Sequence, residues 1–252
     1  MRYFQSKRAM AFLREYFFPF GCSVCGAGLV HAGESWYGLC DTCRDALEQE
    51  LCDTYAAEVC GCCGKPLISE HDRCLSCRLG ESFAFDQVRV LFPYIGKYRQ
   101  LLTAYKFGKN IVLGNFFAEK TGEALEHWEI PGNAEIVPVP PRPGKIRKNG
   151  WDQVEYLATL MERSRGGSRG TSRGHLPVNR CLKRLPSLSQ KELGRENRRT
   201  NLKGRIVTVR QHPKIAVLID DVMTTGSTLD ACASALKAAG TEKVYGLCLF
   251  YD

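Results

Sequence analysis

The segment Ile215–Thr228, IAVLIDDVMTTGST, consists of three pieces with different chemistry. Its first piece, Ile215–Ile219, is an unbroken apolar run of the kind found in strands covered on both faces, typically in a parallel sheet. Asp220 and Asp221 stand where this run stops, and open α/β sheets bind ligands outside the carboxyl ends of their strands. The last piece, Thr224–Thr228, is a loop of small hydroxyl residues around one glycine. The segment therefore predicts a buried strand that brings two carboxylates and a polar loop to a ligand site.

A helix is predicted directly after the hydroxyl loop. Helix-forming residues run from Leu229 to Ala239, and Gly240 can cap the C-terminus of this helix. The loop thus opens a helix N-terminus, where free backbone N–H groups and the helix dipole favour an anion, above all phosphate. It is not a Walker A loop, because no lysine follows its glycine.

The two carboxylates cannot bind the same phosphate as the loop. Asp220 and Asp221 suit ribose hydroxyls, which donate hydrogen bonds to ionised acids, or a bound divalent cation. A phosphorylated ribose satisfies both halves of the segment. The plainer alternative is a buried strand, an exposed turn and a capped helix with two solvated acids. The two adjacent acids directly after a buried run, followed by TTGST, favour the ligand site.

The string VLIDDVMTTGST resembles the fingerprint of the type I phosphoribosyltransferases, which bind 5-phosphoribosyl-1-pyrophosphate with magnesium. The resemblance implies that Asp220 and Asp221 bind the ribose hydroxyls. It assigns the 5′-phosphate to the hydroxyl loop, that is, to Thr224, Thr225, Gly226, Ser227 and Thr228. Whether a transfer reaction follows is a separate question, because fold and loop can be kept while the acceptor changes or is lost.

Length and hydropathy set the broad class of protein. The chain has 252 residues, 44% of them hydrophobic, which suffices for one α/β domain with a small accessory unit. No apolar stretch approaches the ~20 residues of a membrane span. Charges interrupt every apolar run of the basic, aromatic N-terminus, so no secretory signal is predicted. We expect a cytoplasmic protein whose first residues form a short docking helix.

The net charge of +8 comes from one segment. Residues 142–205 hold 17 Lys/Arg against 5 Asp/Glu, a net charge of +12, so the rest of the chain carries −4. Such a segment suits an anionic partner, either a polyphosphate or a nucleic acid, although solvated surface loops could have the same composition. Within it, residues 163–174, RSRGGSRGTSRG, predict a disordered insertion whose Arg-Gly spacing resembles single-stranded nucleic-acid segments.

Ten of the thirteen cysteines lie between Cys22 and Cys77. In CxxC pairs, and without a secretory signal, they indicate metal binding in a reducing compartment rather than disulfides. Each CxxC places two thiolates on one turn, and two such turns complete a tetrahedral zinc site. Gly26 and Gly64 follow their pairs, where a tight turn needs a positive φ. Pairing by neighbourhood gives one site from Cys22, Cys25, Cys40 and Cys43 and a second from Cys60, Cys63, Cys74 and Cys77.

Two features of the cysteine pattern leave alternatives open. The CxxC pairs could be crossed between the sites, and Cys62 could replace Cys60 or Cys63 as a ligand. Cys62 and Cys52 are otherwise left over. Because each site would be saturated with thiolates, the zinc ions are expected to be structural rather than catalytic.

The remaining chain alternates strand and helix patterns, which predicts a small doubly wound α/β domain. We divide the chain into residues 1–80, with the cysteine pairs, and residues 81–252, with the sheet. Strand patterns lie at residues 83–94, 134–139, 178–182, 206–209, 215–219 and 243–251. Helix patterns lie at residues 98–107, 112–128, 151–163 and 229–239.

A second anion site is predicted between the strand at 134–139 and the helix at 151–163. The connecting loop, residues 140–150, has the sequence PPRPGKIRKNG and holds four cations and no acid. A cationic loop between a strand and a helix suits an anion. Its cations are Arg142, Lys145, Arg147 and Lys148.

Taken together, these segments resemble the ComF family, DNA-uptake competence proteins related to amidophosphoribosyltransferase. The resemblance covers nearly the whole chain. Its motifs are the cysteine pairs, the Lys106-Phe107-Gly108 element, VPVPPRPGKIRKNGWDQVEYLA, LSQKELGRENRRTNLKG and VLIDDVMTTGSTLDACASALKAAG. It implies a type I phosphoribosyltransferase-like parallel sheet flanked by helices, after an N-terminal double zinc ribbon. The chain departs from the family at Trp151-Asp152-Gln153, where Phe-Asn-Gln is usual.

The family resemblance also implies roles for the two basic segments. Residues 142–153 would form the pyrophosphate side of a magnesium-dependent site, and residues 188–202 would close over the substrate. Arg147, with Lys145 and Lys148, would neutralise charge that grows on departing pyrophosphate. No residue indicates an acceptor or a general base. The rival hypothesis is a non-catalytic module that handles single-stranded DNA beside a competence helicase and uses the same phosphate loop.

Overall fold

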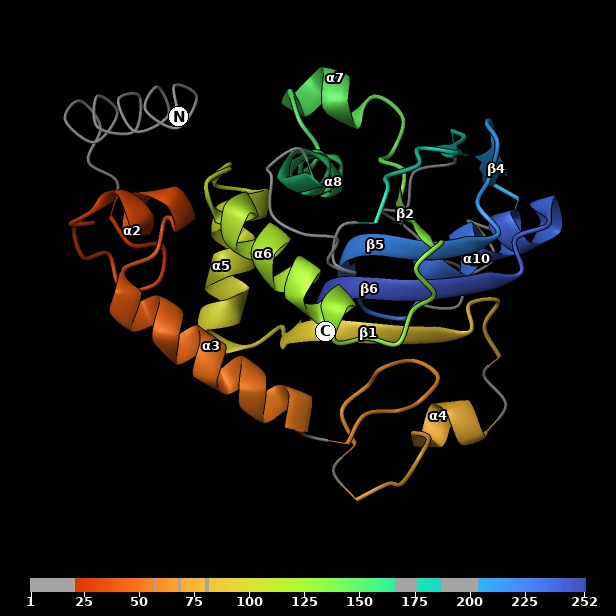
Figure 1. Ribbon diagram of the computed structural model, residues 1–252, viewed down its shortest axis with the longest axis horizontal. Helices are drawn as coiled ribbons and strands as arrows, with labels where there is room; N and C mark the ends of the chain where they lie inside the picture. Colours follow the sequence, from red (N-terminus) through yellow and green to blue (C-terminus); the bar gives the residue numbers. More distant parts are fainter. Residues whose placement is uncertain (1–20, 57, 68, 80–81, 166–175, 187–203) are drawn as a thin grey trace.

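The computed structural model describes residues 21–56, 58–67, 69–79, 82–165, 176–186 and 204–252. Three predicted segments lie wholly or mostly outside the described residues: the N-terminal docking helix, the insertion at 163–174 beyond residue 165, and the closing loop at 188–202. The described part forms a parallel sheet with helices on both faces (Figure 1). The first cysteine-rich unit lies beside the helices of one face, and the second lies beside an edge strand of the sheet. This confirms the predicted fold class of a parallel sheet flanked by helices.

The central sheet has four strands, in the order β1-β6-β5-β2, and every neighbouring pair is parallel. Its strands are β1 (Gln87–Pro93), β2 (Glu135–Pro138), β5 (Ile215–Met223) and β6 (Lys243–Tyr251). β5 lies inside the sheet, and its residues 216–221 are all buried. The apolar run from Ile215 therefore forms the buried parallel strand that its composition predicts.

Two strand boundaries differ from the predicted ones. β5 continues to Met223 rather than ending at Ile219, so both acids lie within the strand. The reason is that β6 is nine residues long and offers partners as far as Tyr251, which lies opposite Met223. β1, an edge strand, begins at Gln87, four residues after the predicted start at Phe83.

The strand patterns at residues 178–182 and 206–209 do not extend the parallel sheet. They contribute to a separate antiparallel pair, β3 (Leu182–Arg184) and β4 (Ile206–Thr208). Val178 makes a single parallel bridge to Ile136 of β2. The neighbouring Pro177 accepts a hydrogen bond from Ile136 but has no N–H with which to continue the ladder.

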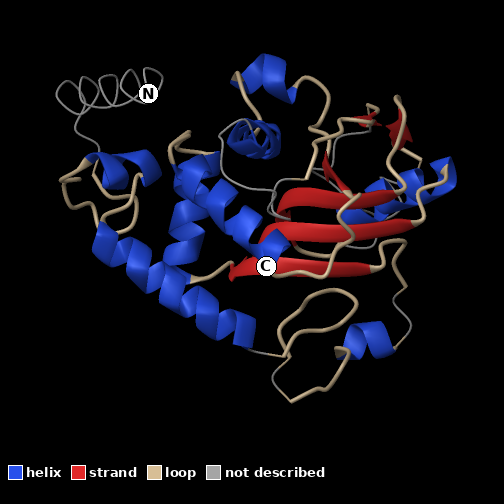
Figure 2. Ribbon diagram, in the orientation of Figure 1, coloured by secondary structure: helices blue, strands red, loops and turns tan. Residues whose placement is uncertain are grey.

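Alternating side chains of β5 enter two different buried clusters, as the geometry of a strand requires. Val217 and Ile219 belong to the first cluster, and Ala216 and Leu218 belong to the second. The first face is covered by α5 (Gly96–Lys106), α6 (Leu113–Glu126) and α8 (Gln153–Arg165), and the second by α10 (Ser227–Ala239). Figure 2 shows helices on both sides of the strands.

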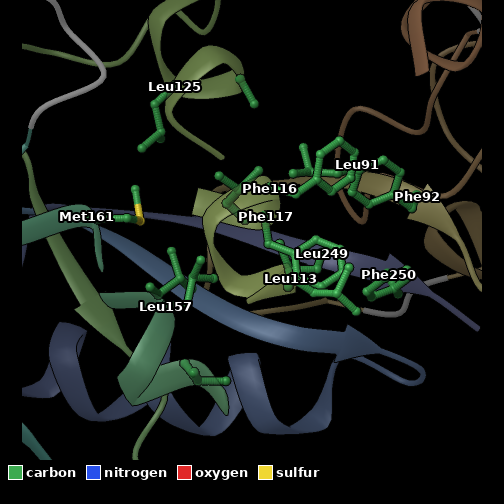
Figure 3. Close-up of a cluster of buried hydrophobic side chains, with 14 of the residues drawn as sticks. Leu91, Phe92, Leu113, Phe116, Phe117, Leu125, Leu157, Met161, Leu249 and Phe250 are labelled. Carbon is green, nitrogen blue, oxygen red and sulfur yellow. The ribbon is translucent and has the colours of Figure 1, made fainter. Parts of the chain in front are cut away.

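Phenylalanine rings pack among leucine side chains in the first cluster (Figure 3). The ring centroid of Phe92 of β1 lies 6.0 Å from that of Phe116 and 5.5 Å from that of Phe250. Phe117 packs edge-on against Phe250 at 5.6 Å. Packed aromatic pairs of this kind stabilise a core beyond the area that they bury. They fix α6 on the sheet and so fix the helices next to it.

The N-terminal part contributes α2 (Ala32–Tyr37), α3 (Asp41–Ala56) and α4 (Leu75–Arg78). Leu47 and Leu51 of α3 are buried in the first cluster. The unit that carries α4 lies beside β1 (Figure 1), where the Val88 N–H donates to the Cys62 carbonyl at 3.2 Å. Among the helices of the described segments, none has the length and apolar character needed to cross a membrane.

Candidate functional site

The eight cysteines of the predicted zinc sites form two separate groups, and in each group all four Sγ atoms lie within 4.8 Å of one another. Cys25 and Cys40 place their sulfurs 3.7 Å apart, and so do Cys63 and Cys74. Zinc–sulfur bonds of about 2.3 Å at tetrahedral angles separate the sulfurs by about 3.8 Å. Donor type, number and spacing therefore fit zinc. The grouping by neighbouring pairs is the one observed, and crossed pairing is wrong.

The same backbone turn opens both cysteine groups. Gly26 N donates to the Cys22 carbonyl at 2.8 Å, and Gly64 N donates to the Cys60 carbonyl at 2.9 Å. Both glycines have the predicted positive φ, +74° and +69°. Burial raises the pKa of the Cys22 and Cys60 thiols, but backbone N–H groups aimed at each sulfur outweigh burial and lower the pKa to about 7. Thiols that deprotonate this easily are good metal ligands.

The remaining described cysteines do not join these groups. Cys62 is half-buried and lies outside the second group, so it does not replace Cys60 or Cys63. Its carbonyl binds β1 instead. The other three, Cys181, Cys232 and Cys248, are fully buried in the second hydrophobic cluster.

The second candidate site lies at the carboxyl end of β5. Asp220 and Asp221 are 9% and 7% exposed. Because successive strand residues point to opposite faces, the two carboxyl groups have different neighbours. Asp220 lies on the side of α10, where its charge acts on Cys232. Asp221 lies on the side of α5 and α8.

Asp221 is held by two groups from these helices. Lys106, the last residue of α5, donates from Nζ to Asp221 Oδ2 at 2.5 Å. Gln153, the first residue of α8, donates from Nε2 to the same oxygen at 2.5 Å. Lys106 belongs to the Lys106-Phe107-Gly108 element, to which the sequence pattern assigns no site role. A lysine ammonium therefore lies where a cation or ribose hydroxyl of a ligand is predicted to bind.

A second lysine connects the cationic loop to this carboxylate. Lys145 begins α7 (Lys145–Asn149) and donates to Asp152 Oδ2 at 2.5 Å and to Gln153 Oε1 at 2.6 Å. Asp152 also caps α8, because its Oδ1 accepts from the backbone N–H groups of Val154 and Glu155. The acid that replaces the usual asparagine thus binds a lysine and starts a helix.

The other three predicted cations, Arg142, Arg147 and Lys148, have exposed side chains. Within the described residues, Arg147 and Lys148 make no ion pair with Asp220 or Asp221. Among the three cations of α7, it is therefore Lys145 that joins the contacts ending on Asp221.

The hydroxyl loop has the local structure that an anion site needs. Gly226 precedes α10 with a φ of +69°, which favours glycine. A Cβ there would lie 3.3 Å from the Phe83 ring. Thr225 Oγ1 and Ser227 Oγ lie 2.7 Å apart and share a hydrogen bond. The N-terminus of this 13-residue helix therefore lies beside the hydroxyls, and the Ser227 N–H donates to Thr225 Oγ1 at 3.4 Å.

The pKa values of Asp220 and Asp221 are shifted in opposite directions. Burial and the charge of Asp221 raise the pKa of Asp220 well above its ordinary value. Burial also raises the pKa of Asp221, but the Lys106 ammonium and the Gln153 amide outweigh it, and the pKa of Asp221 is lowered. The surroundings therefore favour the carboxylate at Asp221 and the protonated acid at Asp220.

The described chain thus combines a parallel α/β sheet, two four-cysteine groups and an acid pair beside a hydroxyl loop at the carboxyl end of a strand. No family model matches the chain. It is similar, however, to "Competence protein F" of Haemophilus influenzae, with 25% identity over 240 residues that cover 90% of this chain and 95% of that protein.

Two further relatives carry the name "Competence protein ComFC". The protein of Streptococcus pneumoniae is 26% identical over 208 residues, which cover 82% of this chain and 84% of the relative. That of Bacillus subtilis is 23% identical over 213 residues, which cover 80% of this chain and 79% of the relative. All three align with most of this chain, and their names agree with the ComF resemblance that its motifs carry.

Proposed function

We propose that the chain binds 5-phosphoribosyl-1-pyrophosphate with magnesium at the carboxyl end of β5. The observation that carries this proposal is the position of the buried acids, Asp220 and Asp221, a few residues before a hydroxyl loop that opens α10. Carboxylates suit the ribose hydroxyls, and the helix N-terminus suits the 5′-phosphate. When bound, magnesium would neutralise charge on the pyrophosphate.

The residues around the acids would change partners when the ligand binds. Lys106 and Gln153 satisfy Asp221 in the unliganded chain. A ribose hydroxyl that donates to Asp221 would take over part of this role. Lys106, which is about a quarter exposed, can then turn toward a phosphate oxygen, because its ammonium is a flexible point charge. Lys145 would stay with Asp152, which fixes the cationic loop.

The biological role that we propose is in natural competence. Three relatives that align over most of the chain are named competence proteins. We further propose that the protein acts in the cytoplasm beside a competence helicase, with zinc in its two cysteine groups.

A more specific proposal is that the protein transfers the phosphoribosyl group to an acceptor. No described side chain identifies a general base for this reaction. Single-stranded DNA binding by the basic segment is the alternative, favoured by its net charge of +12.

Calorimetric titration with phosphoribosyl pyrophosphate and magnesium tests the ligand. In the double variant Asp220→Asn/Asp221→Asn, we expect binding to weaken by an order of magnitude or more. Each hydrogen bond to a charged group contributes roughly 1.5–3 kcal/mol, and about 1.4 kcal/mol is tenfold in affinity. Thr225→Val removes a loop hydroxyl and should weaken binding less.

Glu242→Gln is the matched control, because this acid is 64% exposed and lies at the other end of the sheet, before β6. Circular dichroism would verify that each variant is folded. A folded double variant that binds the ligand as the parent does would mean that the acids do not contact it. The phosphoribosyl pyrophosphate proposal would then be wrong.

A further inference from the structure

The segment that leads into β1, residues 83–86, packs against the hydroxyl loop. Gly226, in the middle of this loop, has no side chain of its own to bury. A Cβ on Gly226 would lie 3.2 Å from Met223 Cε and 3.3 Å from Phe83 Cε1. Met223 is the last residue of β5 and so belongs to the strand that carries the loop. Phe83 comes from a distant part of the chain, and its ring supports the loop from outside that motif.

The ring of Phe83 is continuous with the core. It stacks on Phe85, with the ring centroids 4.6 Å apart and the ring planes 13° from parallel. Phe85 is 3% exposed and belongs to the second cluster, together with Leu229 of α10. Phe83 is half-buried and packs against the same cluster. Stacked aromatic pairs stabilise one another beyond the area that they bury, so the ring that contacts the loop has a fixed place.

Two polar contacts also fix the backbone of this segment on α10. The Ala84 N–H donates to Oδ1 of Asp230, in the first turn of α10, at 2.7 Å. Asp86 forms an ion pair with Lys237, about two turns further along the helix, with 2.8 Å between Nζ and Oδ2. Because the segment is anchored near both ends of α10, the position of Phe83 relative to the start of that helix is set.

We propose that Phe83 is a positioning residue for the hydroxyl loop, which it holds in the conformation that binds a phosphate. The inference deepens the proposed function and rests on it. The loop consists of threonines, a serine and a glycine, so its own side chains bury little apolar surface that could order it. Glycine also loses more conformational freedom on ordering than any other residue. A ring packed on Gly226 orders the loop before the ligand arrives, and such preorganisation raises affinity.

The test is calorimetric titration of Phe83→Ala, the milder Phe83→Leu and a control variant with ribose 5-phosphate and with magnesium pyrophosphate. We expect Phe83→Ala to weaken binding of ribose 5-phosphate roughly three- to tenfold, because the loop must then be ordered on binding. Phe83→Leu should show a smaller loss. Magnesium pyrophosphate has no sugar phosphate for the loop, so its binding should equal that of the parent.

Phe85→Leu is the matched control. It changes the other ring of the same stack, and the three atoms nearest to a Cβ on Gly226 belong to Phe83 and Met223. It should lower the free energy of unfolding in urea but bind both probes as the parent does. Hydrogen exchange without ligand gives a second readout. The amides of residues 225–228 should exchange faster in Phe83→Ala than in the parent, whereas those of residues 216–219 in β5 should keep the parent's rate.

The outcomes separate this inference from the proposed function. If the parent binds ribose 5-phosphate and both Phe83 variants bind it equally well, Phe83 is not a positioning residue and the proposed function stands. A loss of the same size for both probes, or an equal loss in Phe85→Leu, would make Phe83 a general support of the fold and also overturns the inference. A parent that does not bind ribose 5-phosphate overturns the phosphate assignment of the loop and the inference with it. If Phe83→Ala does not fold, Phe83→Leu decides by the same comparisons.

Discussion

Asp220 and Asp221 are neighbours in sequence, but the side chains around them favour opposite protonation states. Asp221 lies next to the Lys106 ammonium and is stabilised as a carboxylate. Asp220 lies on the other face of β5, is buried, and feels the charge of Asp221. A ligand that neutralises this end of the sheet, such as a magnesium-bound sugar phosphate, would remove the conflict. The acids thus store unfavourable electrostatic energy in the unliganded protein.

This difference predicts opposite effects of two similar substitutions. The folded-state pKa of Asp220 is raised, so its protonation favours folding at acidic pH, and this contribution is lost as pH rises through the folded pKa. Asp220→Asn should therefore raise the free energy of unfolding at pH 7, and the gain should vanish below about pH 4. Asp221 has a lowered pKa, so its contribution is present above about pH 4 and is lost as pH falls.

Asp221→Asn should consequently lower the free energy of unfolding at pH 7 by about 1–3 kcal/mol, because it leaves Lys106 without its carboxylate. Urea unfolding at pH 7 and at pH 4 measures both changes. If the two variants shift in the same direction at pH 7, the assignment of the charge to Asp221 is wrong.

Sequence reasoning found the parts of this site that lie in one stretch of chain. The acids and the hydroxyl loop follow a recognisable buried run, and the zinc ligands follow CxxC spacing. Lys106 was given no site role, and Gln153 was expected only on the pyrophosphate side, because they are 115 and 68 residues away from Asp221. Only the packing of α5 and α8 on the sheet brings them to it.

At the scale of elements, the second cysteine turn and β1 fit together as one structure. β1 is an edge strand, and exposed edges invite unwanted pairing. The Cys62 carbonyl accepts a hydrogen bond from the Val88 N–H on this edge, and Gly64 follows two residues later. A Cβ on Gly64 would lie 2.5 Å from the Val88 carbonyl oxygen, closer than any real contact. Glycine is therefore required there both for its φ and for the close approach.

Gly26 provides a matched comparison for Gly64. It has nearly the same φ in the equivalent turn of the first cysteine group, and a Cβ added there would have nothing within 4 Å. Gly26→Ala should cost only the strain of a positive φ, about 1 kcal/mol. Gly64→Ala adds the clash with β1 and should cost about 2–4 kcal/mol. Urea unfolding gives both values, and zinc content should stay at the level of the parent. Equal costs for the two variants would mean that the turn does not dock on β1.

The elements themselves show what a sequence pattern can and cannot decide. The unbroken apolar run of β5 and the helical pattern after it are strong local signals, and both form as predicted. The patterns that became β3 and β4 are weaker, since VNRCL at residues 178–182 contains an asparagine and an arginine. Their failure to join the sheet depends on Pro177 and on the short length of β2, which ends the ladder early. Whether such a short strand joins the sheet depends on pairing with segments far away in the sequence, and the local sequence of one segment does not indicate that pairing.

For the whole molecule, the cysteine groups are part of the core rather than appendages to it. Cys22 belongs to the buried cluster that contains Phe92, and the four cysteines of the second group belong to the cluster that contains Val88 and Leu229. The first unit is also tied to the sheet domain by polar contacts: Asn110 donates to Ser23 Oγ at 2.9 Å. Loss of metal should therefore be felt beyond the N-terminal region.

Zinc content and thermal stability together test this view of the molecule. Elemental analysis of protein purified without added metal should find two zinc ions per chain. Cys63→Ser should retain one, because a tetrahedral site of four thiolates loses most of its affinity for zinc when one thiolate is removed. The unfolding temperature of the whole chain should fall by several degrees in Cys63→Ser, since the second group packs against Val88 on the edge of the sheet.

Cys62→Ser is the control one residue away: it lies outside both groups and should keep two zinc ions and the parent's unfolding temperature. Retention of two ions in Cys63→Ser, or loss of one in Cys62→Ser, would overturn the ligand assignment. Loss of zinc without any change in the unfolding of the sheet would instead separate the metal sites from the core.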